Sequence, residues 1–328
     1  MSSPIADLSY RHYDGELLPP VNRWWAIAKA SIRLSIKKKG FWIWAAISSY
    51  WYLIMMATYY FIDNFFSGAA QRGVVQLGQK NPLLSTIIWK DQFLNGFSIS
   101  QMLLFVIALL VGVGTISNDN RANALLVYLS KPCTKADYVI GKWFGIFLPL
   151  TAVTLAPMLF FYAYCAMSFK SYGFFSQDAL LLPKLLLISM IPGAVHASLA
   201  LGVSSLFNQG RLAGATYSGI YFMSLFFTKA MQVVHFKMAA GDHAASPLVD
   251  KLYYFSIDGI QIGLAKWILA TRGSELFPHQ SDLNGIPPTS LSVPQPSFAY
   301  IVPLALIACG IGVLVAWRRV RAVEVVGR

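Results

Sequence analysis

Six long apolar stretches constrain this chain more than any other feature of its sequence. Each has about twenty residues, and a helix that rises about 1.5 Å per residue needs that length to cross the roughly 30 Å hydrocarbon layer of a membrane. Lys184 and Lys229 lie near the edges of two stretches, where a long basic side chain can reach the interface. The stretches are residues 41–62, 97–117, 143–167, 185–206, 212–232 and 298–317. The sequence therefore predicts an all-α polytopic membrane protein with six transmembrane helices.

The charge content supports this prediction. Charged residues make up 12% of the 328-residue chain and hydrophobic residues 56%, whereas a soluble domain carries about 25% charged residues. The second stretch alone holds twelve Leu, Ile, Val or Phe residues and no ionised side chain. Those residues contribute roughly −4 to −7 kcal/mol to membrane insertion. A soluble globular protein is excluded.

Lys and Arg indicate how the chain is oriented, because positive residues favour cytoplasmic loops. Successive segments between the six spans lie on alternate sides of the membrane, and both ends of the chain lie on one side. The segments on that side hold 16 Lys or Arg in 81 positions, and those on the other side hold 10 in 120. The denser set is residues 1–40, 118–142, 207–211 and 318–328. We therefore expect both termini to lie in the cytoplasm. The membrane is expected to be the bacterial cytoplasmic (inner) membrane. The net charge of +12 then reflects this bias and not a nucleic-acid partner.

Residues 1–40 are the predicted cytoplasmic tail, and the second half of this tail has the pattern of an amphipathic helix. An apolar stripe flanked by basic side chains is typical of a helix that lies in the headgroup layer. The stripe comprises Trp25, Ala28, Ile32 and Ile36, with Trp24 beside it, and the basic flank comprises Lys29, Arg33 and Lys37. A basic helix also suits a calmodulin-like partner, but its position directly before the first span favours an interfacial anchor.

The longest predicted outer loop, residues 233–297, contains a second amphipathic pattern. One helical face is apolar and is interrupted by Gly259 and Gly263. Its members are Ile257, Ile260, Leu264, Trp267 and Ile268. This pattern predicts a short helix that dips into the outer leaflet or lies on it. The proline-rich residues 274–297 are expected to be irregular.

Residues 116–142 are the polar interruption that combines basic residues with a helix-like pattern. Because the residue before a proline is biased away from the helical region, a short helix here is expected to end near Lys131-Pro132. Its apolar residues are Leu125, Leu126, Tyr128 and Leu129, and its basic neighbours are Arg121, Lys131 and Lys135. A solvated loop with a snorkelling helix and a surface on which another protein acts both fit this pattern.

These residues resemble the first intracellular loop of type-2 ABC transporter (ABC-2) permeases. That family shows an acidic-x-Arg turn, a Leu-Ser-x-Pro break and a Tyr-x-x-Gly-Lys entry into the third span. The matching residues are Asp119 and Arg121, then Leu129, Ser130 and Pro132, then Tyr138, Gly141 and Lys142. Lys135 takes the place of the usual arginine, and Asn123-Ala124 stands where the family has a Gly-Thr step. The N-terminal amphipathic helix, the six spans and the long last outer loop agree with the ABC-2 permease architecture.

The resemblance implies a coupling helix, about Asn120 to Leu129, that rests on a cytoplasmic ATP-hydrolysing subunit. A charged turn can set the register of such a partner by complementary charge. Asp119 and Arg121 also fit an ordinary helix start, because Asp is favourable near a helix N-terminus. The implied docking residues are Asp119, Asn120, Arg121, Leu125, Tyr128, Leu129, Lys131, Pro132 and Lys135.

The chain itself shows no phosphate-binding loop. Its Gly141-Lys142 pair precedes Trp143, whereas the GxxxxGK motif needs Ser or Thr next. We therefore expect no cofactor on this chain, with ATP and Mg bound by a separate ABC ATPase. The resemblance implies two ATPase copies, a second permease copy (a homodimer or a related permease) and export of a hydrophobic or amphipathic substrate. An extracytoplasmic accessory protein on the 233–297 loop is left open.

No catalytic or metal-binding constellation is visible in the sequence. The histidines form no HExxH motif, and Cys133, Cys165 and Cys309 have neither metal-ligand nor disulfide spacing. The chain is therefore expected to be a transport subunit and not an enzyme. The alternative is a membrane-embedded enzyme or assembly factor without ATP coupling. That alternative would need polar side chains gathered at one membrane depth, and the sequence shows no such group.

Three residues within the spans are candidates for a substrate path. Tyr50 and Trp51 lie in the middle of the first span, and His196 lies in the fourth. The two aromatic residues also fit simple packing against lipid. His196 could relay protons, although a hydrogen bond to a neighbouring helix is the simpler interpretation.

Prolines and glycines indicate where the spans bend or touch. Pro149, Pro157 and Pro192 are expected to mark kinks that let spans hinge. The spacings Gly141-x-x-x-Gly145 and Gly210-x-x-x-Gly214 allow close helix approach.

Overall fold

The computed structural model describes residues 22–71, 81–85, 87–124, 133–240, 247–273 and 293–320, and every regular element in these ranges is a helix. In chain order they are α1 (Arg23–Ile36), α2 (Lys39–Ser48), α3 (Tyr50–Gln71), α4 (Pro82–Ser85), α5 (Trp89–Gly112), α6 (Gly114–Arg121), α8 (Lys135–Ser168), η2 (Lys170–Tyr172), α9 (Phe174–Gln177), α10 (Leu181–Ser205), α11 (Gly210–Ala240), α12 (Pro247–Tyr253), α13 (Ile257–Leu269) and α15 (Phe298–Arg319). The predicted all-α class is confirmed for the described residues.

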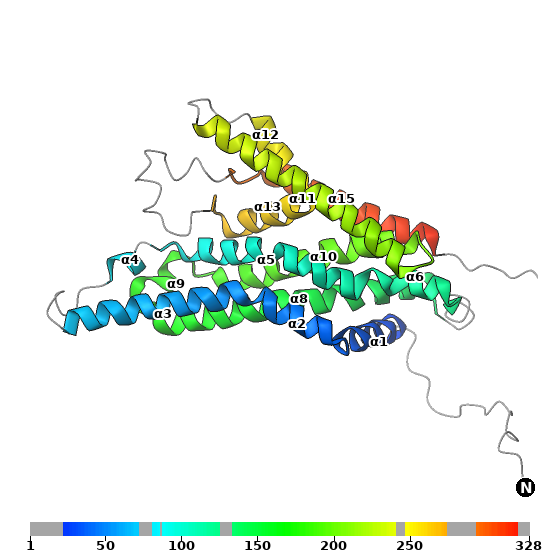
Figure 1. The fold of residues 1–328 in the computed structure, drawn as a ribbon, viewed down its shortest axis with the longest axis horizontal. Helices are drawn as coiled ribbons and strands as arrows, with labels where there is room; N and C mark the ends of the chain where they lie inside the picture. The colour runs from blue at the N-terminus through cyan, green and yellow to red at the C-terminus, as the bar shows by residue number, and fades with distance from the viewer. Residues whose placement is uncertain are drawn as a thin grey trace, which may run out of the picture.

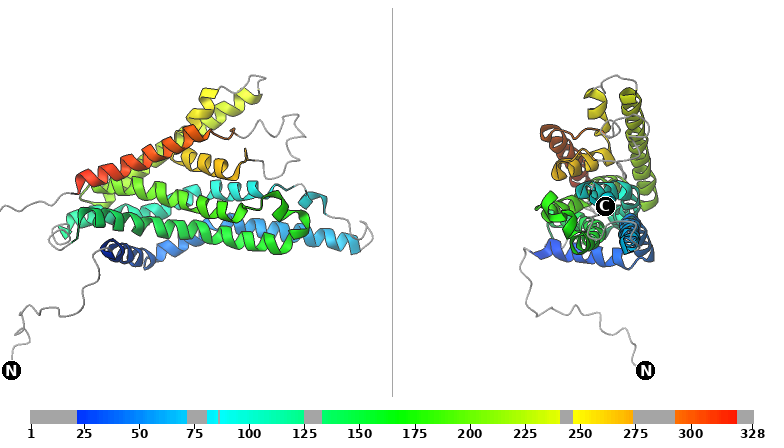
Figure 2. Two further views of the ribbon diagram at one scale, coloured as in Figure 1. Left: turned by 180° about the vertical axis from the view of Figure 1, so that it is seen from behind. Right: turned by 90° about the vertical axis from the view of Figure 1, so that its left-hand side faces the viewer.

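The long helices form an elongated bundle (Figure 1). At its centre, α10 packs against α5, α8, α13 and α15, and α1 packs against α8. α11 and α15 cross the other helices at an angle, and α12 projects away from the bundle (Figures 1 and 2). α1, α6 and the last turn of α15 lie at one end, called here the α6 end, and α4 and α9 lie at the other, the α9 end.

Within the part of the chain that the structure describes, five helical segments are long and apolar enough to cross a membrane. They are Lys39–Phe65, Trp89–Arg121, Lys135–Ser168, Leu181–Ser205 and Phe298–Arg319, and they cover five of the six predicted spans. The remaining predicted span, 212–232, falls in α11, which has 31 residues but is not among the five. The apolar residues of α11 are interrupted by Lys229 and by the hydroxyl-bearing Tyr217, Ser218, Tyr221, Ser224 and Thr228.

Two glycines of α8 let α1 come unusually close. A Cβ atom at Gly141 would lie 2.6 Å from the backbone oxygen of Trp24, and one at Gly145 would lie 2.5 Å from Cβ of Ser31. Real Cβ atoms essentially never lie this close to a neighbour, so a side chain at either position would displace α1. The predicted close approach at this glycine pair is therefore a contact with the N-terminal helix.

The face of α1 that meets α8 differs from the predicted apolar stripe. Ala28 is buried within the protein, whereas Trp25 and Ile36, which were expected to face the headgroup layer, are 43% and 40% exposed. Because the glycine pair draws the two backbones together, small side chains such as Ala28 and Ser35 are the ones turned inward. The basic residues Lys29, Arg33 and Lys37 are exposed.

Two breaks between consecutive helices lie away from the three prolines of the spans, whose kinks stay a prediction. α8 runs unbroken through Pro149 and Pro157, and α10 runs unbroken through Pro192. The breaks lie instead at Ser49, between α2 and α3, and at Val113, between α5 and α6. The second break lies beside a group of largely buried polar side chains.

Candidate functional site at the junction of α6 and α8

The segment that connects α6 to α8 has described residues at both of its ends. Asn123, just after α6, has a φ of 51°, which is in the left-handed region that Asn adopts more readily than most residues. At the start of α8, Thr134 Oγ1 accepts a 3.1 Å hydrogen bond from the Asp137 N–H, and Asp137 Oδ2 accepts a 3.0 Å bond from the Thr134 N–H. This reciprocal capping box satisfies two backbone donors and fixes where α8 begins.

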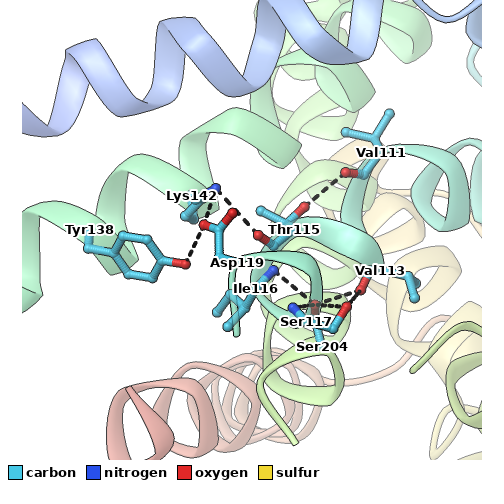
Figure 3. A network of polar contacts seen from close by, with 9 residues as sticks. All are labelled: Val111, Val113, Thr115, Ile116, Ser117, Asp119, Tyr138, Lys142 and Ser204. Atoms are coloured by element: carbon cyan, nitrogen blue, oxygen red, sulfur yellow. Dashed lines mark hydrogen bonds and ion pairs between the residues drawn. The ribbon is translucent and has the colours of Figure 1, made fainter. Parts of the chain in front are cut away.

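Asp119 joins the two helices across this turn. Its Oδ2 lies 2.7 Å from Nζ of Lys142 and accepts a 2.8 Å hydrogen bond from the Tyr138 hydroxyl (Figure 3). Lys142 also donates to the backbone oxygen of Thr115 at 3.3 Å. Tyr138 is buried, and the Lys142 and Asp119 side chains are only 10% and 20% exposed. Loss of either charged partner would leave a largely buried charge without its counterion, which is unfavourable.

Ser204 of α10 holds the break between α5 and α6. Its Oγ accepts hydrogen bonds of 3.0 Å from the N–H groups of Ile116 and Ser117, and it donates to the backbone oxygen of Val113 at 2.5 Å (Figure 3). The two N–H groups belong to the first turn of α6, where a helix has donors without partners of its own. A hydroxyl from a neighbouring helix thus acts as the cap of α6. Consequently α6 is fixed to α10 as well as to α8.

The structure gives the implied docking residues different surroundings. Asp119 is turned inward, whereas Arg121 is exposed. Asn120 donates to the backbone oxygen of Phe207 at 3.3 Å. The Lys135 ammonium lies 5.0 Å from the centre of the Trp317 ring of α15. The remaining residues, Leu125, Tyr128, Leu129, Lys131 and Pro132, lie outside the described residues, as does most of the implied coupling helix.

The three side chains that meet at Asp119 come from the motifs that resemble ABC-2 permeases. The family model described as "ABC-2 family transporter protein" matches residues 25–316. The chain belongs to this family. A search of curated proteins found no match.

As an ABC-2 permease, the chain is the transmembrane subunit of an ABC transporter and lacks a nucleotide-binding domain. Permeases of this family pair with ABC ATPases. Among the described residues of the permease, no group of three or more His, Cys, Asp or Glu side chains could hold a metal ion.

A second polar cluster of the permease lies between α10, α11 and α13. The fully buried His196 has Nδ1 2.7 Å from the Tyr217 hydroxyl and Nε2 3.4 Å from Nε2 of Gln261. Beside it, Tyr221 donates to Oδ2 of Asp258 at 3.1 Å. The hydrogen bond of His196 to a neighbouring helix, the simpler interpretation of this residue, is confirmed by Tyr217 of α11. The gathering of polar side chains beside it was not expected. The reason is that α13, assigned to an outer loop, folds back against the middle of α10.

Asp258 and Gln261 are polar residues of α13 that the predicted apolar face of this helix did not include, although their spacing is visible in the sequence. They are three residues apart, so they share one face of the predicted helix. That face is the buried one: Asp258 is 5% exposed and Gln261 is fully buried. Polar residues at helical spacing inside an otherwise apolar helix indicate a polar contact within the bundle.

The three residues suggested for a substrate path do not meet. Tyr50 is 38% exposed, and Trp51 packs against Gly96 of α5, where a Cβ atom would lie 2.9 Å from Trp51 Cδ1. His196 instead contacts α11 and α13.

Two cavities lie between α5 and α11, and none of those three residues lines either one. The α6 cavity, of about 1030 Å³, is lined by Lys38, Leu110, Val113, Asn118, Arg121, Arg211 and their neighbours. The α13 cavity, of about 540 Å³, is lined by Ser98, Gln101, Lys229, Asp258, Lys266, Arg272 and their neighbours. An aromatic pair lies between the two cavities. Phe105 of α5 stacks on Tyr221 of α11 with ring centres 3.7 Å apart, and on each helix this residue lies between those that line one cavity and those that line the other.

Proposed function

We propose that this permease exports an amphipathic substrate and is driven by a separate cytoplasmic ABC ATPase that acts on residues 116–135. The observation that carries the proposal is the junction around Asp119. There α6 is bonded to α8 through Lys142 and Tyr138 and to α10 through Ser204. A force applied to the segment between α6 and α8 is thus passed to α8 and α10, as well as to α5, which directly precedes α6.

The proposal includes a sixth crossing, made by α11. α1, which leads into α2, and the end of α15 lie at the same end of the bundle (Figure 1). A chain whose first and last helices meet the same side of the membrane crosses it an even number of times. The five apolar segments therefore need one more crossing, and α11 supplies it. Its polar side chains are compatible with a crossing, because Tyr217 and Tyr221 bond to His196 and Asp258 within the protein. The excess of Lys and Arg supports placing the α6 end in the cytoplasm.

In this arrangement α1 is an anchor at the cytoplasmic surface. Its Trp25 and Ile36 side chains are exposed apolar groups on a helix whose exposed cations include Lys29 and Arg33. Such a helix lies in the headgroup layer, with apolar groups toward the acyl chains and cations toward the phosphates. Its contact with α8 ties the third span to that surface.

The substrate path we propose follows α5 and α11 from the α6 cavity to the α13 cavity. The lining of the α6 cavity combines apolar side chains such as Leu110 with the cations Arg121 and Arg211, which suits an amphipathic molecule. The stacked rings of Phe105 and Tyr221 separate the two cavities and must part for the substrate to pass. Two permease copies, each with one ATPase, complete the proposed complex.

Co-purification tests this function. Permease solubilised from its native membrane should bring down an ABC ATPase, and ATP hydrolysis by that subunit should change when the permease is present. Recovery of the intact permease with no ATPase, from membranes that contain one, would contradict the proposal. The alternative function, a membrane enzyme, is not favoured by the buried polar cluster at His196, because the family match identifies the chain as a permease.

A further inference from the structure

An apolar groove of about 550 Å³ runs between α8 and the two N-terminal helices, and is called here the α8 groove. Its walls are Ile32 and Ile36 of α1, residues of α2 between Phe41 and Ser49, and residues of α8 between Leu148 and Pro157. Alanines on both α2 and α8 leave this space, because an alanine side chain ends at Cβ. The groove lies outside the path along α5 and α11 that we propose for the substrate.

The side chains of the α8 groove leave an occupant little to hydrogen-bond. Among the lining residues, only Trp42 and Ser49 have polar side-chain atoms. Trp42 Nε1 donates to the backbone oxygen of Ile36 at 2.9 Å, and the Ser49 hydroxyl donates to the backbone oxygen of Ala45 at 3.1 Å. Since apolar surface is stabilised when it leaves water, a groove of this composition favours a hydrocarbon occupant.

The dimensions of the groove fit one fatty acyl chain. From Leu148 to Pro157 the groove follows α8 for about 14 Å, at about 1.5 Å per residue. One leaflet supplies half of a hydrocarbon layer of about 30 Å, so the groove is as deep as a leaflet. Because a cavity of about 150 Å³ holds benzene, the volume of the groove corresponds to roughly twenty carbon atoms. A helix about 10 Å across would need about twice that volume over the same length.

Exposed cations lie where α1 and α2 meet the groove. Arg33 lies three residues before Ile36, and Lys39 lies three residues before Trp42, so each cation shares a helix face with a lining residue. Both side chains are exposed. They can therefore reach an anionic group that lies at the surface end of an acyl chain.

The described carboxylates at this end of the bundle do not neutralise these cations. α1 and α2 contain no Asp or Glu. Asp119 is paired with Lys142 at 2.7 Å, so the two charges offset each other. Asp137 caps the start of α8, about 16 Å along that helix from Leu148, and a Debye length at physiological salt is only about 8 Å. A positive excess therefore remains beside the groove.

We infer that the α8 groove binds an anionic phospholipid of the cytoplasmic leaflet. One acyl chain lies between α2 and α8, and the phosphate of the headgroup meets Arg33 and Lys39. The choice of leaflet follows from the proposed position of α1 at the cytoplasmic surface. Binding of this lipid requires neither an ATPase nor transport, so its test can fail while the export proposal stands, and the reverse also holds.

The test measures lipid binding to the purified full-length permease by native mass spectrometry. Phosphatidylglycerol, which carries a net negative charge, is compared with phosphatidylcholine, which carries none, with the same acyl chains in both. We expect phosphatidylglycerol to bind about fivefold more tightly, the effect of one basic side chain close to an anionic lipid. Equal binding of the two lipids would overturn the inference.

Two matched substitutions on α8 assign the bound lipid to the groove. Ala156→Phe places a ring in the groove and should remove most of the bound phosphatidylglycerol. Ala163→Phe is the control, because Ala163 is an exposed alanine about two turns further along the same face of α8 and does not line the groove. Equal retention of lipid by the two variants would mean that the lipid only surrounds the protein, and would overturn the inference.

Substitution of a cation tests the headgroup contact without changing the groove, so it applies even if Ala156→Phe does not fold. Arg33→Gln should remove most of the preference for phosphatidylglycerol. Arg318→Gln, which removes an exposed charge from the last turn of α15 at the same end of the bundle, is the control and should keep it. Equal preference in these two variants would overturn the inference. So would loss of a permease dimer in Ala156→Phe with lipid binding unchanged, because a second copy would then occupy the groove.

Discussion

Asp119 and Lys142, which lie on either side of the turn between α6 and α8, form an ion pair with Oδ2 2.7 Å from Nζ. Both residues belong to the motifs that resemble ABC-2 permeases, and so does Tyr138, which donates to the same carboxylate. The motifs therefore describe a structural junction inside the permease. We propose that the ATPase instead contacts Arg121, an exposed residue close to Asp119 in the sequence.

Replacing Lys142 with Met should destabilise the permease. The substitution keeps much of the side-chain volume but leaves Asp119 without its counterion, and we expect a loss of about 2 kcal/mol, less than for a fully buried pair. The measurement is the apparent melting temperature of the detergent-solubilised protein, followed by tryptophan fluorescence. Lys29→Met, which changes an exposed lysine of α1, is the control and should melt like the parent. In the double variant Asp119→Asn/Lys142→Met, part of the loss should be recovered; additive losses would argue against a direct pair.

Ser204→Ala should destabilise the permease by about 1–2 kcal/mol, because it leaves two N–H groups of α6 without their shared acceptor. The adjacent Ser205→Ala is the matched control, since the Ser205 hydroxyl bonds only within α10, to Gly202, among the described contacts. Hydrogen exchange of the α6 amides gives the local readout. Faster exchange at Ile116 and Ser117 in the Ser204→Ala variant alone is the expected result. Equal exchange in the two variants would mean that Ser204 does not cap α6.

Gly141→Val should displace α1 from α8. The new side chain would start 2.6 Å from the Trp24 backbone oxygen, which cannot move away without the helix. Limited trypsin digestion should then cleave at the exposed Lys29 and Arg33 several times faster than in the parent. Gly310→Val is the control, because nothing lies within 4 Å of a Cβ atom there. Unchanged cleavage in Gly141→Val would show that the close contact with α1 is absent in the membrane.

Arg121→Glu should weaken capture of the ATPase about tenfold, since reversal of an exposed charge at a docking surface turns attraction into repulsion. Arg319→Glu reverses another exposed arginine at the same end of the bundle and is the control. Both variants should melt like the parent, which separates docking from folding. If Arg121→Glu captures as much ATPase as Arg319→Glu does, Arg121 is not a docking residue.

The lengths of the apolar stretches and the distribution of charge predicted much of this fold, because a chain that crosses a membrane must satisfy its backbone hydrogen bonds within helices. Five apolar stretches became the expected helices, and the glycine spacing at Gly141 and Gly145 marked a real close contact. The limits of the helices were harder to predict. α6 continues to Arg121 and α8 begins at Lys135, so the helices enter what was predicted as a loop. Tertiary bonds, above all those of Asp119 and Lys142, stabilise these polar turns, and hydropathy does not register such bonds.

The polar cluster was missed for a different physical reason. Asp258 was assigned to an outer loop because α13, at 13 residues, is too short to span a membrane. A short helix can still fold back among the spans when its polar side chains find partners there, as Asp258 finds Tyr221. Chain order alone could not indicate that partnership, because the two residues lie on different helices. The inward turn of Asp119 escaped prediction in the same way.

The side of the membrane on which the turn between α6 and α8 lies decides whether a cytoplasmic ATPase can act on it, and Cys133 reports that side directly. Cys133 is partly exposed in that turn, and burial together with the nearby Asp137 raises the pKa of its thiol, so a mildly alkaline buffer is needed to form the reactive thiolate. Cells expressing the permease are treated with a membrane-impermeant maleimide before and after permeabilisation, with Cys133→Ser as the control. We expect labelling of Cys133 only after permeabilisation. Labelling of Cys133 in intact cells would place the turn outside, beyond the reach of any cytoplasmic ATPase, and would contradict the account.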